Sequence, residues 1–399
     1  MIYYRSDYSD TEYRILRLSR KTGLFRLEEI ALKQGKTLAE LGRELQRQRL
    51  NRQDFLADTR SLEMETDSYG STLQLSLDDK PLSFTVGETA HQQIAARLNI
   101  PFRYYKKMQE EAPALLDQNV NTWFGKNPER RMIRVLDGNV RAFLSDRYRR
   151  LDNLELCAAV LPVINEMKNS VIESCEVTPT HLYLKVVNRR LKAEVRVGDV
   201  VQAGFVVSNS EVGLGSLRVE PLVFRLVCKN GLICKDLAQK KYHVGRQVNT
   251  SDDSAYELYS EETLAQDDKT FFLKVQDIVR SAVDEARFML TVDKMREATQ
   301  IPLKHDPVKS VELLADKFQL TENERGDILR QLFMGADNSR YGLVNAVTAA
   351  SKIAKTYERA TDLERIGGEI LSLPVPQNIL PPPSYDAYQA ISEYQTIPA

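Results

Sequence analysis

The sequence has little of what would assign it to a membrane, to an oxidising compartment or to a leader-directed pathway. No apolar run approaches the roughly 18 residues that a membrane-spanning helix needs. Four cysteines in 399 residues are too few for a disulfide framework, so we expect reduced and mostly buried thiols. The first ten residues, MIYYRSDYSD, contain no apolar core of a signal peptide. These features predict a cytoplasmic protein with no membrane partner.

Signatures of nucleotide, metal and nucleophile chemistry are also missing. There is no GxxxxGK[ST] loop for a nucleoside triphosphate and no GxSxG turn for a serine nucleophile. The four histidines are scattered, and none stands in a pattern typical of a zinc site. We therefore predict no cofactor, no metal and no catalytic residue, which favours a binding protein over an enzyme. A two-metal nuclease stays open, because its carboxylates can come from distant positions.

Charge is balanced over the whole chain and concentrated locally. Lysine and arginine number 55 against 56 for aspartate and glutamate, which gives a net charge of -1. Yet the stretch 130–150, RRMIRVLDGNVRAFLSDRYRR, contains seven arginines. A net charge near zero argues against bulk non-specific binding to nucleic acid, but it is compatible with a local basic surface.

Apolar periodicity and turn residues predict an α+β fold, with an antiparallel sheet of hairpins and packed helices in the middle of the chain. A helical C-terminal region follows this core, and two segments, at Asp152 with Glu155 and at Thr321 with Glu324, have capping-box spacing. The parts that we expect are a charged helical arm at 1–65, an α+β core at 66–250, a helical domain at 251–372 and a Pro-rich, disordered tail at 373–399.

The arginine-rich stretch predicts a β-hairpin. Asp137-Gly138 is a strong type I′ turn signal, because glycine accepts the positive φ that this turn requires. Folded about this turn, Arg134 faces Arg141 across the two strands. Side chains alternate between the faces of a hairpin, so one face should be apolar and the other cationic. The predicted apolar face is Ile133, Val135, Val140, Ala142 and Leu144, and the predicted cationic face is Arg130, Met132, Arg134, Arg141 and Phe143.

Three partners for the cationic face remain open: carboxylates of the chain itself, the phosphates of a nucleic acid, or another anionic ligand. Two arginines opposite each other repel by an amount comparable to the roughly 0.2–1 kcal/mol of a good cross-strand pair, so the face needs an anion. The arginine fork binds phosphate bidentately, and its plane stacks on bases. Phe143 would add a stacking surface. A three-residue loop ending at Asn139 would change this register.

A second basic segment, CKNGLICKDLAQKKYHVGR, covers residues 228–246. It reads either as a solvated turn and loop or as the continuation of one basic groove, if the fold brings both segments together. The candidate nucleic-acid-binding residues are Arg130, Arg134, Arg141, Phe143, Arg147, Tyr148, Arg149, Arg150, Lys229, Lys235, Lys240, Lys241 and Arg246.

Several stretches together resemble one family. They are LNIPFRYYKKM, NTWF, VRAFLSDRYRRLDN, VSNSEVGLGSLRVEPLVFRLVCKNGLI and YGLVNAVTAASKIAK. In this order, over residues 70–365, they resemble the phage/plasmid-like family long labelled a domain of unknown function. The resemblance implies a setting in prophages, phages or mobile plasmids. It carries no agreed chemistry, so no residue role transfers from it, but it favours DNA as the partner of the arginines.

These features lead to one leading hypothesis and two alternatives. The leading hypothesis is a protein of a phage or mobile element that binds single-stranded DNA in recombination or replication, without ATP, as single-strand annealing proteins do. This is an analogy of properties rather than a motif match. We expect a homo-oligomer in the bacterial cytoplasm, with phage or host recombination or replication proteins as further partners. The alternatives are a metal-dependent nuclease or other DNA-processing enzyme, and a defence or counter-defence protein that binds a host factor.

Overall fold

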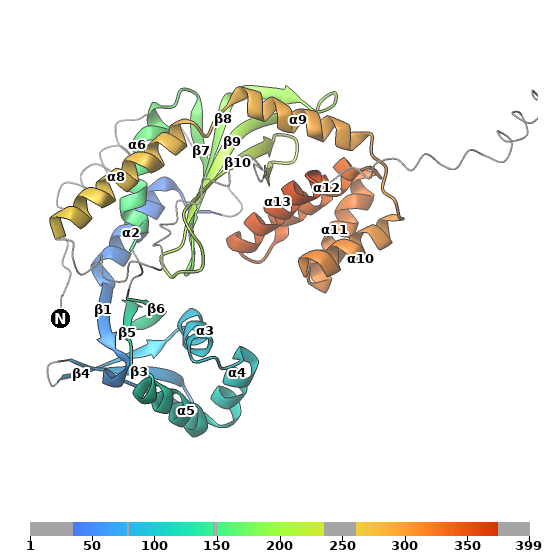
Figure 1. Cartoon of the computed structure of the whole chain (residues 1–399). Coiled ribbons are helices and arrows are strands. Elements are labelled where there is room, and N and C mark those ends of the chain that lie inside the picture. Colours follow the sequence, from blue (N-terminus) through green and yellow to red (C-terminus); the bar gives the residue numbers. More distant parts are fainter. Residues whose placement is uncertain (1–34, 78–79, 147, 149, 235–260, 374–399) are drawn as a thin grey trace, which may run out of the picture.

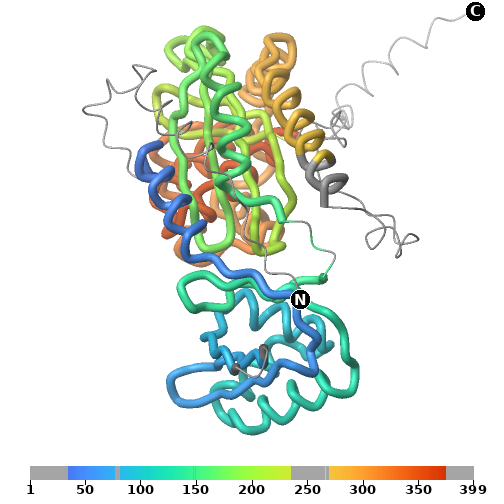
Figure 2. The backbone as a smooth tube through the Cα atoms, turned by 90° about the vertical axis from the view of Figure 1, so that its left-hand side faces the viewer, coloured from blue at the N-terminus to red at the C-terminus, as the bar shows by residue number. Residues whose placement is uncertain are grey.

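A computed structural model describes residues 35–77, 80–146, 148, 150–234 and 261–373 of the chain. Within these ranges the fold is α+β, as the sequence predicts, but two sheets stand where one was expected. Figures 1 and 2 show the two sheets one above the other, each with its own helices. None of the helices in the described ranges combines the length and the apolar character that a membrane-spanning segment needs.

The first sheet has six strands in the order β1-β5-β6-β4-β3-β2, and only β4 and β6 pair in parallel. The strands are β1 (Arg52–Asp58), β2 (Leu62–Asp67), β3 (Gly70–Leu77), β4 (Lys80–Val86), β5 (Arg130–Leu136) and β6 (Asn139–Ser145). The two edge strands, β1 and β2, are consecutive in the sequence, and a 3-10 turn of three residues, Thr59–Ser61, joins them. The sheet must therefore curl strongly, so that its two edges approach each other.

Helix α5 protects the edge strand β2. The helices of this unit are α3 (Glu88–Arg97), α4 (Phe102–Glu111) and α5 (Pro113–Lys126), and they share one apolar core with the sheet. On α5, Asn121 accepts a hydrogen bond from the amide of Met64 at 2.8 Å and donates one to its carbonyl at 2.9 Å. Asp117 accepts from the amide of Thr66 at 2.8 Å. These bonds occupy backbone groups that would otherwise invite pairing with another chain.

The second sheet is antiparallel, with five strands in the order β11-β10-β9-β8-β7. The strands are β7 (Ser170–Val177), β8 (Leu182–Glu194), β9 (Val200–Asn209), β10 (Arg218–Arg225) and β11 (Asn230–Ile233). Three helices cover one side of it: α2 (Leu38–Asn51), α6 (Asn153–Glu166) and α8 (Glu261–Arg280). The central strand β9 is almost wholly buried, because helices lie against both of its faces.

The C-terminal helices form a second core against the same sheet. They are α9 (Glu285–Thr299), α10 (Pro307–Phe318), α11 (Glu322–Gly335), α12 (Arg340–Ala350) and α13 (Tyr357–Leu371). The predicted capping box of Thr321 and Glu324 is confirmed at the start of α11. Helix α13 lies so close to β11 that a Cβ on Gly368 would come within 2.0 Å of the carbonyl oxygen of Ile233. Only glycine permits this approach.

The expected boundary at 65/66 falls inside β2, because residues 52–67 form two strands of the first sheet. The alternation of buried and exposed residues in β1 and β2 is typical of a half-buried strand, although their charged side chains suggested a solvated arm. The expected core at 66–250 contains parts of both sheets. Its boundary at 250/251 and the Pro-rich segment from residue 374 lie outside the described residues.

Candidate nucleic-acid interface

The hairpin of β5 and β6 has the predicted turn and a different register. Asp137 and Gly138 both have positive φ, at 53° and 75°, and the two residue pairs nearest the turn are those predicted. Beyond them the register shifts, so that Arg134 lies opposite Ala142. Arg141 is the extra residue of a β-bulge, and the predicted pairing of Arg134 with Arg141 is wrong.

The bulge reverses the face of each residue that follows it on β6, because side chains alternate with a period of two. Phe143 turns into the core of the first sheet and stacks on Phe124, with ring centroids 5.7 Å apart. Ala142 and Leu144 turn to the opposite face and cluster with Val212, which follows β9 of the second sheet. Both faces of the hairpin are therefore buried, and the predicted exposed face with Phe143 on it does not form.

Arg134 lies at the centre of an ion-pair network between the two sheets, and none of its surface reaches solvent. Its guanidinium donates to the carboxylate of Asp54 at 3.0 and 3.2 Å and to Asp152 at 2.7 Å. It also donates to the backbone carbonyl of Glu211 at 2.9 Å. The partners come from β1, from the start of α6 and from the loop after β9, so one side chain ties three distant segments together.

Burial and charge oppose each other in this network, and charge prevails. Burial alone would lower the pKa of Arg134, but Asp152 and Asp54 raise it above its ordinary value. Burial alone would raise the pKa of Asp152, yet Arg134 and Arg52 hold it well below its ordinary range. Both groups are therefore charged at neutral pH, and each is neutralised by the chain itself.

Two more of the predicted residues belong to the same network. Arg141 is mostly buried and donates to the carboxylate of Glu211 at 2.6 Å. Arg150 lies 3.3 Å from the carboxylate of Asp54. Of the partners left open by the sequence, the carboxylates of the chain are the ones that Arg134 and Arg141 contact. Their placement corrects the assignment of these two arginines and of Phe143 as ligands of an external phosphate or base, because the fold encloses them.

The first turn of α6 is capped by a residue from another segment. Asp152 stands at the N-cap, as predicted, but its side chain makes no cap hydrogen bond, since arginines hold the carboxylate. Instead of Asp152, the carboxylate of Glu211 accepts a hydrogen bond from the amide of Asn153 at 2.5 Å. Glu155 does not complete a capping box. Burial, with a contribution from the neighbouring Asp152, raises the pKa of Glu155 to about 7.

Of the predicted residues within the described ranges, two are exposed, and they belong to different sheets. Arg130 begins β5 of the first sheet, and Lys229 lies in the turn between β10 and β11 of the second. Tyr148 is half-buried, and its hydroxyl donates to the carbonyl of Ser210 at 3.0 Å. Burial raises the pKa of this hydroxyl. The predicted residues that lie outside the described ranges are Arg147, Arg149, Lys235, Lys240, Lys241 and Arg246.

An exposed aromatic side chain seven residues before Arg130 in the sequence was missed by the sequence reasoning. Trp123, near the end of α5, is 40% exposed, and the ammonium of Lys126 lies 5.6 Å from its ring centroid. The hydroxyl of Thr59 donates to the carbonyl of Phe124 at 2.9 Å and accepts from the amide of Glu129 at 3.2 Å. This hydroxyl therefore links the residue after Trp123 to the residue before Arg130.

Cations outnumber acids at this end of the first sheet. Glu129 is shared by Arg97 and Arg131, and Asp58 pairs with Arg60. Neither Lys126 nor Arg130, both exposed, forms an ion pair with a described residue. We call Trp123, Lys126 and Arg130 the Trp123 surface. A tryptophan with a lysine three residues later, directly before the arginine run, is the signal in NTWFGKNPERR that could have indicated it.

Metal-ligating side chains do not form a site in the part of the chain that the structure describes. In the described ranges, no three His, Cys, Asp or Glu side chains are grouped so that they could hold a metal ion. The four cysteines are free thiols, and three of them are buried, in line with the prediction from the sequence.

Comparisons with known proteins give a family and no function. The model of a family described as "Domain of unknown function (DUF932)" matches residues 142–368. No curated protein and no solved structure matches the chain. The match begins in β6 and runs through the second sheet to α13, so the Trp123 surface precedes it. Because the match covers more than half of the 399 residues, the chain belongs to this family of unknown function.

Proposed function

We propose that the protein binds single-stranded DNA through the Trp123 surface. The observation that supports this proposal is a solvent-exposed indole with Lys126 over its ring, near the start of a strand whose exposed Arg130, like Lys126, pairs with no acid in the described ranges. An exposed aromatic ring stacks on an unpaired base, which contributes roughly 1–3 kcal/mol per base. Lys126 and Arg130 contact the flanking phosphates. A single strand fits better than a duplex, because its bases are free to leave their own stack.

The wider role rests on the resemblance to the phage/plasmid-like family. That resemblance supports DNA as the partner, and we propose that the protein belongs to a phage or mobile element and acts in the bacterial cytoplasm. Absence of a nucleotide-binding loop from the sequence favours an ATP-independent activity in recombination or replication. Strand annealing is such an activity, and it requires an oligomer. We therefore propose a homo-oligomer, which light scattering after size exclusion tests with and without oligonucleotide. A monomer under both conditions argues against annealing.

Trp123 makes the binding test direct, because it is the only tryptophan in the chain. Intrinsic fluorescence excited at the indole therefore reports on this surface alone. Titration with an oligothymidylate at low salt should quench that fluorescence, and added salt should reverse the change. A duplex of equal length should give a weaker response. Absence of binding to any single strand at low salt contradicts the proposed function.

Charge reversal tests where the strand binds. The double variant Lys126→Glu with Arg130→Glu should weaken binding at least tenfold, measured by the anisotropy of a labelled oligonucleotide. Both side chains are exposed, so the thermal unfolding curve should stay close to that of the wild type. The matched control is Arg190→Glu, at an exposed arginine on β8 of the second sheet. If the control loses binding and the double variant keeps it, the interface lies elsewhere.

A further inference from the structure

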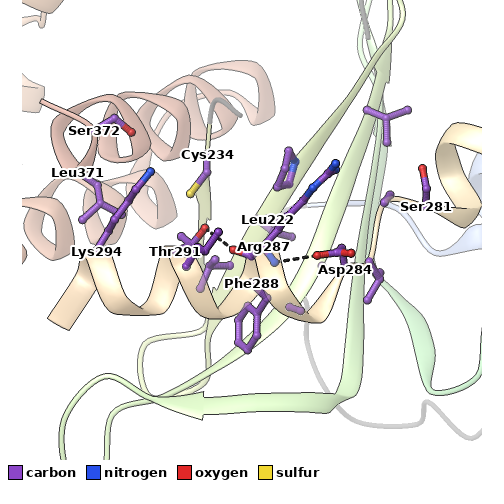
Figure 3. A pocket seen from close by; sticks show the side chains of 18 of the residues that line it. Leu222, Cys234, Ser281, Asp284, Arg287, Phe288, Thr291, Lys294, Leu371 and Ser372 are labelled. Carbon is purple, nitrogen blue, oxygen red and sulfur yellow. Dashed lines mark hydrogen bonds between the residues drawn. The ribbon is translucent and has the colours of Figure 1, made fainter. Parts of the chain in front are cut away.

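A cavity of about 270 Å³ lies between α9 and the second sheet, away from the Trp123 surface (Figure 3). We propose that it binds a small amphipathic anion, that is, a molecule with an apolar body and one anionic group such as a carboxylate, phosphate or sulfonate. The cavity is slightly smaller than the roughly 300–1,000 Å³ typical of ligand sites, so it suits a small molecule better than a peptide.

Small residues line the cavity on the strand β9 and in the connection between α8 and α9, and they leave room for it. Ala203 and Gly204 lie on β9, and Ala282 lies in the connection between α8 and α9. A Cβ on Gly204 would come within 2.2 Å of the carbonyl oxygen of Val186 on the adjacent strand. The strand pairing therefore excludes a larger residue at this position.

The walls are apolar, which suits the body of the proposed ligand. Leu222 and Val223 come from β10, Phe288 from α9 and Leu371 from the end of α13. At the rim, Leu290 is 63% exposed. A bound apolar group would remove this surface from water, which is the main source of affinity for ligands of this kind.

The charge at the mouth of the cavity is positive. Arg287 and Lys294 lie two turns apart on α9, and both line the cavity. Leu371 and Ser372 line the same cavity as Lys294 (Figure 3). The carboxylate of Asp284 also lines the cavity and caps α9 by accepting a hydrogen bond from the amide of Arg287 at 2.8 Å, so the three charged side chains leave one net positive charge. Lys294 is exposed and forms no ion pair with any residue in the described ranges. An anion at this rim would complement it.

Two dyes of nearly the same shape test the proposal. Anilinonaphthalene sulfonate carries one negative charge, and N-phenyl-1-naphthylamine is neutral; both fluoresce when they enter an apolar site. The wild type should bind one equivalent of the sulfonate. Lys294→Glu should weaken sulfonate binding at least fivefold and change binding of the neutral dye less than twofold. The control Lys309→Glu, at an exposed lysine on α10 that pairs with Glu312, should change neither.

A filling substitution tests the place of binding. Ala282→Phe should abolish binding of both dyes, and its unfolding curve shows whether the variant is folded. If it does not fold, labelling of the Cys234 thiol, which lines the cavity, gives a second measurement in a Cys228→Ser background. Either dye should then slow labelling. The proposal is overturned if the wild type binds no sulfonate dye or if Lys294→Glu leaves that binding unchanged. It is also overturned if Ala282→Phe still binds the dyes and neither dye slows the labelling of Cys234. Oligonucleotide binding should be the same in Lys294→Glu and wild type, so the two proposals fail independently.

Discussion

The guanidinium of Arg134 on the first sheet donates to the carboxylate of Asp152 at the start of α6, 2.7 Å away, in the interior between the two units. Substitution of Arg134 by methionine keeps much of the side-chain volume and removes the charge. Asp152 and Asp54 would then be buried without their main counterion, which typically costs about 3–5 kcal/mol. Urea unfolding at pH 7 measures this loss.

The matched control is Arg130→Met on the same strand, because that side chain is exposed. Its free energy of unfolding should stay within about 0.5 kcal/mol of the wild type. Equal effects of the two substitutions would contradict the central place of Arg134 in the network. This contrast reverses the expectation from sequence, in which Arg134 and Arg141 were candidate nucleic-acid-binding residues.

Glu155 should make the stability of the protein depend on pH. Its pKa in the folded protein is raised from 4.5 to about 7, so the folded state holds this proton more tightly than the unfolded state does. The contribution of the Glu155 carboxyl group to the free energy of unfolding is complete below pH 4.5 and is lost as the pH rises through 7. Glu155→Gln stays neutral throughout. The variant should therefore gain about 1–2 kcal/mol relative to the wild type between pH 5 and pH 8, an amount that allows for partial solvent exposure. A difference that does not change with pH would contradict this.

Two glycine-to-alanine substitutions in helices should have opposite signs. At Gly368 in α13, the new Cβ would meet the backbone of β11 at 2.0 Å, so helix and strand must separate. Overpacking of this kind costs about 1–3 kcal/mol. At Gly326 in α11, the added Cβ would meet no atom within 4 Å apart from the adjoining backbone of its own helix. Alanine should therefore stabilise the helix by up to about 1 kcal/mol. Thermal unfolding of both variants measures the contrast, and a gain for Gly368→Ala would contradict the close packing of α13.

The salt dependence of DNA binding measures how many phosphates the Trp123 surface contacts. For single strands, each contact adds about 0.7 to the slope of log K against log salt concentration. Removal of two contacts in the Lys126→Glu, Arg130→Glu variant should therefore lower the slope by roughly 1.4. Trp123→Ala should weaken binding and leave the slope unchanged, since stacking releases no counterions. An unchanged slope in the charge variant would show that these two cations do not contact phosphate.

Local signals predicted the turn and the capping box, and they failed at the bulge. Asp137-Gly138 fixes a tight turn by its own backbone preference, and Thr321 with Glu324 caps a helix within four residues. The bulge at Arg141 instead depends on distant partners. Arg141 reaches Glu211, 70 residues away in the sequence, and Phe143 on the same strand is placed in the core of the first sheet. A pattern read with period two along one strand contains no information about such contacts.

The same limit explains how the candidate site was missed. Arginines dominate the stretch 130–150, but Asp54, 80 residues before Arg134, neutralises part of that charge. The composition of the stretch cannot show which arginines find a carboxylate. Exposure of Trp123 is likewise a property of the assembled unit, since it depends on how α5 lies along β2.

The segment that matches the family, 142–368, lacks the counterions of carboxylates that it buries. It begins within β6, so a fragment cut at its ends would retain Asp152 and Glu211 and lose their counterions Arg52, Arg134 and Arg141, which lie before it. Buried carboxylates deprived of these counterions disfavour a compact state. The residues that precede the family match therefore act as an obligatory complement to it, and expression of the matched segment alone should give a poorly folded product.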